Sequence, residues 1–267
     1  FKRLVKKPVQ EYIKLRRLAK VIPILNDSDQ RLLDIALEYG FSSHANFTRA
    51  FKETYGITPE DYRKTSRTLN NFEKPELSMD YILIEEGVPL IAGNIVLEIG
   101  RRTLKQPEIY LGFETEIRIS EQVPLGENTG IDVPGQLWCQ YHHEKEAIAP
   151  HLKNGTEMGM SYSANPEQGT FTYFAGGFAE TVPEKMGNGF VKNELSAGEY
   201  IVCRIEAESF EELVTTALVQ ANKYLFQTWL PSHELVTEPF AAEKYYLDIK
   251  DINCMEIWVR PLVSKRV

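Results

Sequence analysis

The sequence has few cysteines, and their arrangement does not indicate disulfides. Cys139, Cys203 and Cys254 lie far apart, and no CxxC pair occurs. Secreted domains that depend on disulfides carry an even number of cysteines, so this pattern predicts a reducing, cytoplasmic location. Long apolar runs are also missing, and the basic start lacks the apolar core of a signal peptide. We therefore expect a protein that is neither exported nor embedded in a membrane.

Motifs of common enzyme classes are missing too. No glycine-rich phosphate loop occurs, and residues 159–163 lack the closing glycine of a nucleophile elbow. His142, His143 and Glu144 are adjacent, but consecutive helical residues point about 100° apart, and no third ligand follows at metal spacing. These absences argue against catalytic residues of a known hydrolase class, against a bound metal and against any other cofactor.

Charge is distributed unevenly along the chain. The formal charge is −8, with 30 Lys and Arg against 38 Asp and Glu. Residues 1–72 hold 14 basic and 8 acidic side chains, which leaves 16 basic and 30 acidic ones in the remainder. Because the phosphate backbone selects for basic surfaces, only the first quarter of the chain has the charge expected of a DNA-binding module.

The hydrophobic pattern changes once along the chain. Apolar residues recur at helical spacing as far as residue 67, whereas strand-like segments begin at residue 81. The residues between them are polar and include Asn70, Asn71 and Pro75, as expected of a linker. We predict an all-α domain at residues 1–67, a linker at 68–78 and an α+β domain at 79–264.

Four helices are predicted in the first domain. The first covers residues 12–25, and the second, from about residue 29, ends at Gly40, which accepts the left-handed conformation of a helix exit. The third begins at a capping serine and turns Phe47 and Phe51 inward, and the fourth follows the capping residue Thr58. Two short helices around a glycine-containing turn, the second with a basic outer face, predict a helix-turn-helix.

Eight strands and two helices are predicted in the second domain. The strands are expected at residues 81–84, 95–99, 109–119, 158–162, 170–175, 200–206, 242–246 and 255–262. Helices at 135–148 and 209–230 are each followed by strands. This order predicts two similar halves of strand, helix and strands, packed as one antiparallel sheet with helices on one face.

A motif in the first domain resembles a known family. Residues 33–52 combine an alanine in one helix, a Gly-Phe turn and paired phenylalanines in the next helix, and Gly56, Pro59 and Tyr62 follow. This pattern resembles the second helix-turn-helix unit of the AraC/XylS transcription regulators. That family carries two such units, and the chain begins near the end of the first, with Lys6 where a glycine is common.

The resemblance implies which side chains of the third helix contact DNA. They are the outward-facing residues His44, Ala45, Asn46, Thr48, Arg49 and Lys52. Such a face is ordinarily only solvated, but the basic domain and the motif favour DNA binding. We expect Arg49 to contact guanine, Ala45 a thymine methyl and Asn46 a base edge. Thr48 or Lys52 would hold phosphate, and His44 would contact either phosphate or solvent.

The second domain resembles the GyrI-like effector-binding domains found in multidrug-sensing regulators. Short matches carry the resemblance, in order, at residues 137–141, 197–200, 229–231, 242–245 and 256–261. The combination of both domains in this order resembles the right-origin-binding regulator subgroup.

Candidate ligand-binding residues follow from strand alternation together with this resemblance. Alternation places Glu243 with Tyr245 on one strand face, and Glu256 with Trp258 on a face of another strand. The resemblance implies a ligand cavity that contains Glu243 and Trp258. A carboxylate among aromatic rings favours a cationic aromatic ligand. The remaining candidates lie on the predicted helices, where core packing is the simpler interpretation: Trp138, Tyr141 and Phe226.

These features predict a ligand-responsive transcription regulator whose partners are promoter DNA, a small amphipathic or cationic effector and RNA polymerase. Two alternatives stay open. Some relatives of the GyrI-like domain are hydrolases with a Glu and a Tyr in one cavity, so Glu243 could act as a general base. The domain could also have lost its ligand and serve as a protein-interaction platform. The attached DNA-binding module favours the regulator.

Overall fold

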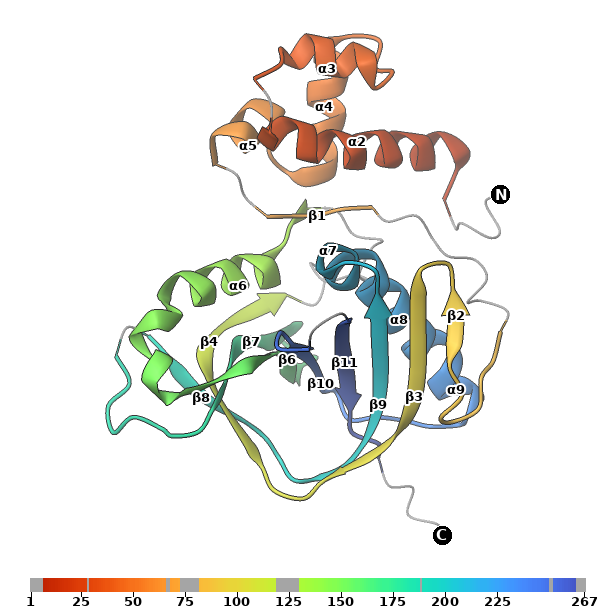
Figure 1. The fold of residues 1–267 in the computed structure, drawn as a ribbon. Coiled ribbons are helices and arrows are strands. Elements are labelled where there is room, and N and C mark those ends of the chain that lie inside the picture. Colours follow the sequence, from red (N-terminus) through yellow and green to blue (C-terminus); the bar gives the residue numbers. More distant parts are fainter. Residues whose placement is uncertain are drawn as a thin grey trace. The chain divides into compact units, whose positions relative to one another are not determined.

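The structure is a computed structural model of the 267-residue chain. It describes residues 7–27, 29–65, 68–72, 82–118, 130–187, 189–249 and 252–262. The chain divides into two compact units (Figure 1), one formed by Phe1–Leu77 with Val123–Gln136 and the other by Ser78–Gln122 with Leu137–Val267. The described residues 130–136 therefore group with the helical unit, whereas the sequence interpretation assigned them to the second domain.

The first unit is built from the four predicted helices. They are α2 (Val9–Asp27), α3 (Leu32–Glu38), α4 (His44–Tyr55) and α5 (Pro59–Thr65). After α3, Gly40 adopts a left-handed φ of 79°. The Ser43 side chain caps α4 by accepting a hydrogen bond from the backbone N–H of Asn46. Phe47 and Phe51 are fully buried against α2 and α3. The helix-turn-helix prediction is confirmed, although α3 begins three residues later than Asp29.

A short two-stranded ribbon completes this unit. Strand β1 (Leu69–Asn70) pairs antiparallel with β5 (Gly130–Ile131). Tyr55 Oη donates to Asn71 Oδ1 at 2.9 Å, and Arg16 Nη1 donates to the carbonyl of Phe72 at 2.9 Å. Residues 68–72, which were predicted as linker, are thus hydrogen-bonded within the helical unit. Residues 73–78 of the predicted linker lie outside the described residues.

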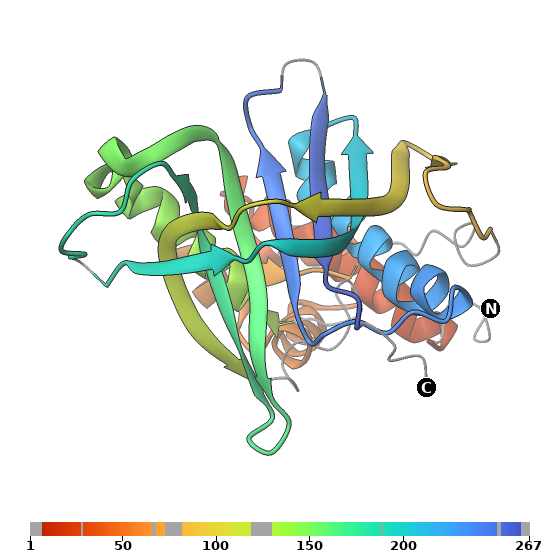
Figure 2. The same ribbon diagram turned by 90° about the horizontal axis from the view of Figure 1, so that it is seen from below.

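The second unit contains a curved antiparallel sheet, which has nine strands in the described part of the chain. Its strands run in the spatial order β2-β3-β9-β11-β10-β6-β7-β4-β8. Their bounds are β2 (Leu90–Ala92), β3 (Ile95–Leu104), β4 (Glu108–Arg118), β6 (Leu152–Asn165), β7 (Thr170–Ala179), β8 (Val191–Leu195), β9 (Gly198–Ala207), β10 (Ala241–Tyr246) and β11 (Asn253–Val259). Figure 2 shows two long arms, β3 into β4 and β8 into β9, that join the two ends of the sheet.

Two helical segments interrupt the strands. The first is α6 (Val133–Glu144), followed by the 3-10 turns η3 (Lys145–Ala147) and η4 (Ala149–His151). The second combines α7 (Phe210–Glu212), α8 (Leu218–Tyr224) and α9 (Leu230–Ser232) with the π-helical turns η5 (Leu213–Ala217) and η6 (Leu225–Trp229). Within the described residues, no helix is both long and apolar enough to cross a membrane.

The predicted internal duplication is present. In one half β4, α6, β6 and β7 follow one another, and the sheet order is β4-β7-β6; in the other, β9, the α7–α9 segment, β10 and β11 give the order β9-β11-β10. The halves meet where β6 pairs with β10, with Glu243 opposite Gly159. Residues of α7–α9, with Trp138 of α6 at the margin, pack on one face of the sheet. The α+β prediction with helices on one face is confirmed.

In the large sheet, one predicted strand is absent and two strands were missed. Residues 82–84 are not in a strand, and Tyr81 lies outside the described residues. The backbone of Ile84 is held by side chains instead: its amide donates to Tyr224 Oη at 3.1 Å, and its carbonyl accepts from Trp229 Nε1 at 3.0 Å. Strands β2 and β8, which end the sheet order, were not predicted, because β2 is short and β8 alternates only weakly.

Candidate functional sites

The outer face of α4 is the candidate DNA interface. Burial of Phe47 and Phe51 fixes the orientation of this helix, so the residues predicted to contact DNA lie on its other side. His44, Ala45, Asn46, Arg49 and Lys52 are exposed, and Thr48 is half-buried. The surface geometry required by the prediction is therefore present, while the DNA-contacting roles stay predictions.

Hydrogen bonds connect several of these exposed side chains. Asn46 Nδ2 donates to Ser42 Oγ at 2.5 Å, and Arg49 Nη2 donates to Asn46 Oδ1 at 3.0 Å. His44 Nε2 lies 3.5 Å from Thr48 Oγ1. Arg49 is thus linked through the first turn of its own helix to the loop before it.

Three other arginines of this unit are bound to backbone carbonyls. Arg17 Nη1 donates to the carbonyl of Gly40 at 2.8 Å, in the turn before α4. Arg63 Nη2 donates to Gln30 at 2.9 Å, and Arg16 reaches the carbonyl of Phe72. These contacts use part of the basic charge of the unit to join its helices and turns.

The candidate ligand site surrounds Glu243 on the helix-covered face of the sheet. Its Oε2 accepts from Tyr245 Oη at 2.9 Å and from Tyr173 Oη at 3.5 Å. Trp138 Nε1, on α6, donates in turn to Tyr173 Oη at 3.1 Å. Glu243 itself is half-buried, whereas both tyrosines are buried. We call Trp138, Tyr173, Glu243 and Tyr245 the Glu243 cluster.

Two glycines below the helix α6 make room for tyrosine hydroxyls. A Cβ at Gly159 would overlap the hydroxyl of Tyr173 and would lie 3.3 Å from Glu243 Oε2. A Cβ at Gly177 would overlap the hydroxyl of Tyr141. At these two positions, tyrosine hydroxyl groups can therefore lie directly against the backbone of the sheet.

Aromatic rings extend the cluster along α6. The Trp138 ring meets those of Tyr245 and Tyr141 edge to face, with centroids 5.4 and 5.9 Å apart. Tyr141 is almost fully buried, and burial raises the pKa of its hydroxyl. Phe226, on the second helical segment, is 39% exposed and is not part of the buried core. Of the three predicted helical aromatics, the structure brings Trp138 and Tyr141 to the site.

A second carboxylate lies on the same face and was not predicted. Glu157 of β6 is opposite Tyr245, and it accepts from His142 at 2.9 Å and Lys145 at 3.0 Å. Burial alone would raise the pKa of Glu157, but hydrogen bonds and charge from His142 and Lys145 outweigh it and lower the pKa. The sequence interpretation began this strand at Met158, one residue too late to include the carboxylate.

Glu256 and Trp258 lie on the opposite face of the sheet from Glu243. In the register between β10 and β11, Glu243 faces Ile257, so the neighbours of Ile257 point the other way. Ile257 belongs to the core under the helices, whereas Trp258 packs against Tyr200 in the other core. The expectation that Trp258 and Glu243 share a cavity is therefore wrong. Alternation was correct within each strand, but the register between strands has no local sequence signal.

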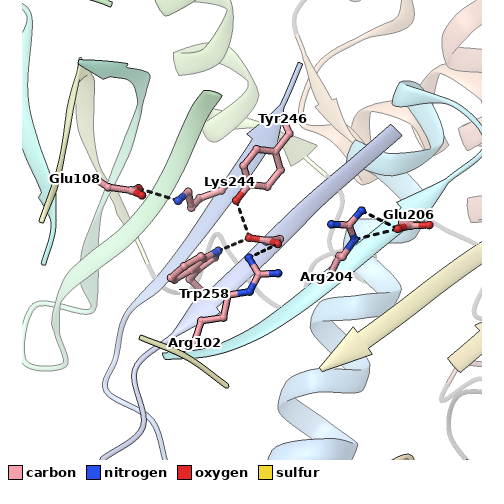
Figure 3. Close-up of polar contacts among 8 residues, drawn as sticks. Arg102, Glu108, Arg204, Glu206, Lys244, Tyr246 and Trp258 are labelled. Atoms are coloured by element: carbon pink, nitrogen blue, oxygen red, sulfur yellow. Dashed lines mark hydrogen bonds and ion pairs between the residues drawn. The ribbon is translucent and has the colours of Figure 1, made fainter. Parts of the chain in front are cut away.

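Protein groups surround Glu256 (Figure 3). Its carboxylate accepts from Tyr246 Oη at 2.7 Å and Trp258 Nε1 at 3.0 Å, and pairs with Arg102 at 2.7 Å. Lys244 Nζ lies 4.6 Å from the centroid of the Trp258 ring. Glu256 is only 2% exposed. This carboxylate and ring already have cationic partners from the chain itself, so their arrangement supports a structural role.

The same network joins the two halves of the sheet. Lys244 Nζ of β10 donates to Glu108 of β4 at 2.8 Å (Figure 3). Tyr110 Oη donates to the same carboxylate at 2.6 Å. Burial and the neighbouring Glu108 charge raise the pKa of Tyr110.

A shallow hollow lies next to the Glu243 cluster. It has a volume of about 250 Å³ and is lined mainly by apolar atoms of Ser161, Tyr162, Ala164, Phe171, Pro239, Phe240 and Ala241. Ala241 and Ser161 are opposite each other, two residues from Glu243 and Gly159 on the same strands. Because alternate residues share a face, Ser161 and Ala241 lie on the Glu243 face, whereas Tyr162 and Phe240 pack against the core on the opposite face, so only part of the hollow belongs to the face that carries the carboxylate.

A metal site does not form in the described part of the chain, where no three His, Cys, Asp or Glu side chains gather. His142, a member of the histidine pair considered from the sequence, contacts Glu157 instead.

Comparison with known families defines the class of the chain. Residues 104–260 match the GyrI-like small molecule binding domain, and residues 1–65 match a helix-turn-helix domain. The chain belongs to the GyrI-like family, and it carries an AraC-type helix-turn-helix domain ahead of the GyrI-like domain.

Individual relatives match most of the chain. The chain is 42% identical over 211 residues to the right origin-binding protein of Escherichia coli K12, and 26% identical over 211 residues to the transcriptional regulator Rob of Salmonella typhimurium. Each match covers 77% of this chain and 65% of the relative. The chain thus spans just under two thirds of the length of these relatives.

Among solved structures, an integron cassette protein from the mobile metagenome of Vibrio cholerae is similar. The TM-score is 0.45 at 14% identity, and the match covers 63% of this chain and 99% of that protein.

Proposed function

We propose that this chain is the DNA-binding and effector-binding part of a cytoplasmic transcription regulator. The observation that carries the proposal is the presence in one chain of an exposed recognition helix and a GyrI-like small-molecule-binding domain. A regulator of this kind must bind promoter DNA and sense an effector, and each of these two functions then has a surface of its own. Promoter DNA and RNA polymerase are the macromolecular partners that this role implies.

The proposed effector is a small amphipathic cation that binds at the Glu243 cluster. The half-buried carboxylate supplies the negative charge, and Trp138 and the two tyrosines supply aromatic surface. The adjoining hollow is lined mainly by apolar atoms, which suits the apolar body of such a molecule.

Charge selectivity follows from desolvation. A carboxylate that loses water on ligand binding needs compensation, and tyrosine hydroxyls supply only part of it. A cationic ligand adds a counter-charge, which a neutral molecule of the same shape lacks. The cation should therefore bind more tightly than its neutral isostere.

Calorimetry with a matched pair tests this proposal. We propose 4-phenylbutyltrimethylammonium and its neutral carbon isostere, each titrated into the wild-type chain and Glu243→Gln. The wild type should favour the cation by about 1–3 kcal/mol, and Glu243→Gln should remove most of that preference.

The matched control is Glu206→Gln, which removes one negative charge from the other face of the sheet, where Glu206 pairs with Arg204. It should keep the full preference. A preference for the cation that persists in Glu243→Gln would show that another group recognises the charge.

A further inference from the structure

The starting point is the chain of hydrogen bonds on the exposed face of α4. Ser42 Oγ, the Asn46 amide and the Arg49 guanidinium are joined in that order, at 2.5 and 3.0 Å. Asn46 and Arg49 are three residues apart on the helix, so their side chains are neighbours, and both are exposed.

Donor and acceptor chemistry fixes the orientation of the Asn46 amide. A guanidinium has five N–H donors and no acceptor, so the amide atom that faces Arg49 must be the oxygen. The amide nitrogen then faces Ser42, whose hydroxyl oxygen accepts the bond. Both ends of the Asn46 amide are therefore engaged within the protein.

This arrangement changes what Asn46 can do on DNA. An asparagine that reads adenine must align its amide plane with the base edge. Here Ser42 and Arg49 each take one of the two hydrogen bonds that the amide nitrogen and oxygen can form, and together they set the direction of that plane. The bond to Asn46 occupies one N–H of Arg49, which leaves donors for a bidentate contact with guanine.

We infer that Asn46 is a positioning residue, which orients the Arg49 guanidinium for guanine and does not itself read a base. The inference rests on the proposed DNA-binding role of α4. It replaces the expectation that Asn46 contacts a base edge, and it gives Ser42, which sequence reasoning did not select, a role in holding the amide.

A double-mutant cycle on DNA tests the inference. Duplexes that the full chain prefers would be selected from a randomised library, and each guanine in them replaced by 7-deazaguanine, which lacks the N7 acceptor. Arg49→Ala should abolish discrimination at one guanine. Asn46→Ala should reduce discrimination at that same guanine by about threefold to tenfold, and should have no further effect in the Arg49→Ala background.

Two further variants separate positioning from a general loss of binding. Asn46→Asp keeps an acceptor for Arg49, so it should retain most of the discrimination while weakening all duplexes alike. Lys52→Ala should also weaken all duplexes alike, as expected for a phosphate contact. Additive effects of Asn46→Ala and Arg49→Ala, or discrimination lost at a different base pair, would overturn the inference. Unchanged discrimination in Arg49→Ala would instead overturn the proposed role of α4.

A measurement without DNA decides the same point. In nitrogen-15 NMR, the Arg49 guanidinium should give resolved, slowly rotating N–H signals in the wild type, and these should broaden in Asn46→Ala but not in Lys52→Ala. Identical guanidinium signals in wild type and Asn46→Ala would show that Asn46 does not hold the side chain.

Discussion

Gly159 is important for the candidate ligand site because it has no side chain. Its Cα lies opposite Glu243 in the sheet, directly below the Tyr173 hydroxyl. Any Cβ there must displace the hydroxyl that connects Glu243 with Trp138. The geometry of the candidate ligand site therefore depends on a residue that contributes no functional group.

Gly159→Ala should destabilise the fold and disturb the ligand site together. We expect a loss of about 1–3 kcal/mol in unfolding free energy from overpacking, measured by urea denaturation, and a weaker cation preference in calorimetry. Gly100→Ala is the control, because a Cβ at Gly100 meets open space. Equal stability of the two variants would contradict the close approach at Gly159.

The Glu157 carboxylate leads to a prediction about how the unfolding free energy depends on pH. Its pKa is lowered from the ordinary value of 4.5 by His142 and Lys145, so its ionised form stabilises the folded state above the unfolded pKa. That contribution is lost as the pH falls through the lowered folded-state pKa. The wild type should exceed Glu157→Gln in unfolding free energy by about 1–3 kcal/mol at neutral pH.

Urea denaturation between pH 7 and pH 3 measures this difference, which should stay constant down to about pH 5 and shrink below it. Glu146→Gln, at an exposed position in the turn after α6, should show little change. A difference that grows as the pH falls would reverse the assigned sign.

Sequence reasoning identified the site residues that alternate within one strand, and it missed the site residue that another strand supplies. Glu243 with Tyr245, and Trp138 on its helix, were predicted and lie together. Tyr173 comes from β7, two strands away from Glu243, and no local pattern pairs the two residues. The resemblance placed Trp258 in the site, and the register between β10 and β11, which depends on tertiary contacts, places it on the other face.

At the level of elements, α6 shows how a helix start was missed although its signal is present. Asp132 Oδ1 accepts from the Gly135 amide at 2.9 Å, which is the bond of a helix cap. Pro134 occupies the first turn, another common feature of helix starts. The predicted start at residue 135 took the glycine as the boundary, whereas the carboxylate three residues earlier determines it.

Asp132→Ala should therefore weaken the first turn of α6 and the adjoining β5. The expected cost is about 0.5–2 kcal/mol, measured by urea denaturation, with faster amide exchange at Gly135. Asp132→Asn keeps a capping oxygen and should recover most of the stability. Equal losses in both variants would mean that the carboxylate charge, and not the cap, is what stabilises the helix start.

For the whole molecule, the two domain types and the duplicated α+β architecture followed from periodicity and charge. The contribution of Gly130–Ile131 to the helical unit did not, because these residues pair with Leu69–Asn70 across about sixty positions. Such pairing leaves no trace in local composition. The segment that precedes α6 therefore looked like part of the second domain.

Limited proteolysis should test both the linker position and the composition of the helical unit. The linker prediction places the first cut within residues 73–78, and the nicked chain should still elute as one species, because the helical unit includes residues from both sides of the cut. Denaturation should then release two fragments. First cleavage inside residues 82–262 would contradict the boundary, and fragments that separate without denaturant would contradict the composition of the unit.

The crossing arms of the sheet also determine the order in which it can be completed. β4, β6 and β7 have all been synthesised once Ala179 has been added, so the first half can pair before the second half is made. β3 precedes that half but pairs with β9, where Val96 meets Glu206 about one hundred residues later. β3 can form a short hairpin with β2 at once, but its other edge must wait, with its backbone groups unpaired, until β9 has been synthesised. Pairing across such separations is slow and exposes strand edges, so this is the step at which the nascent chain is most open to misassembly.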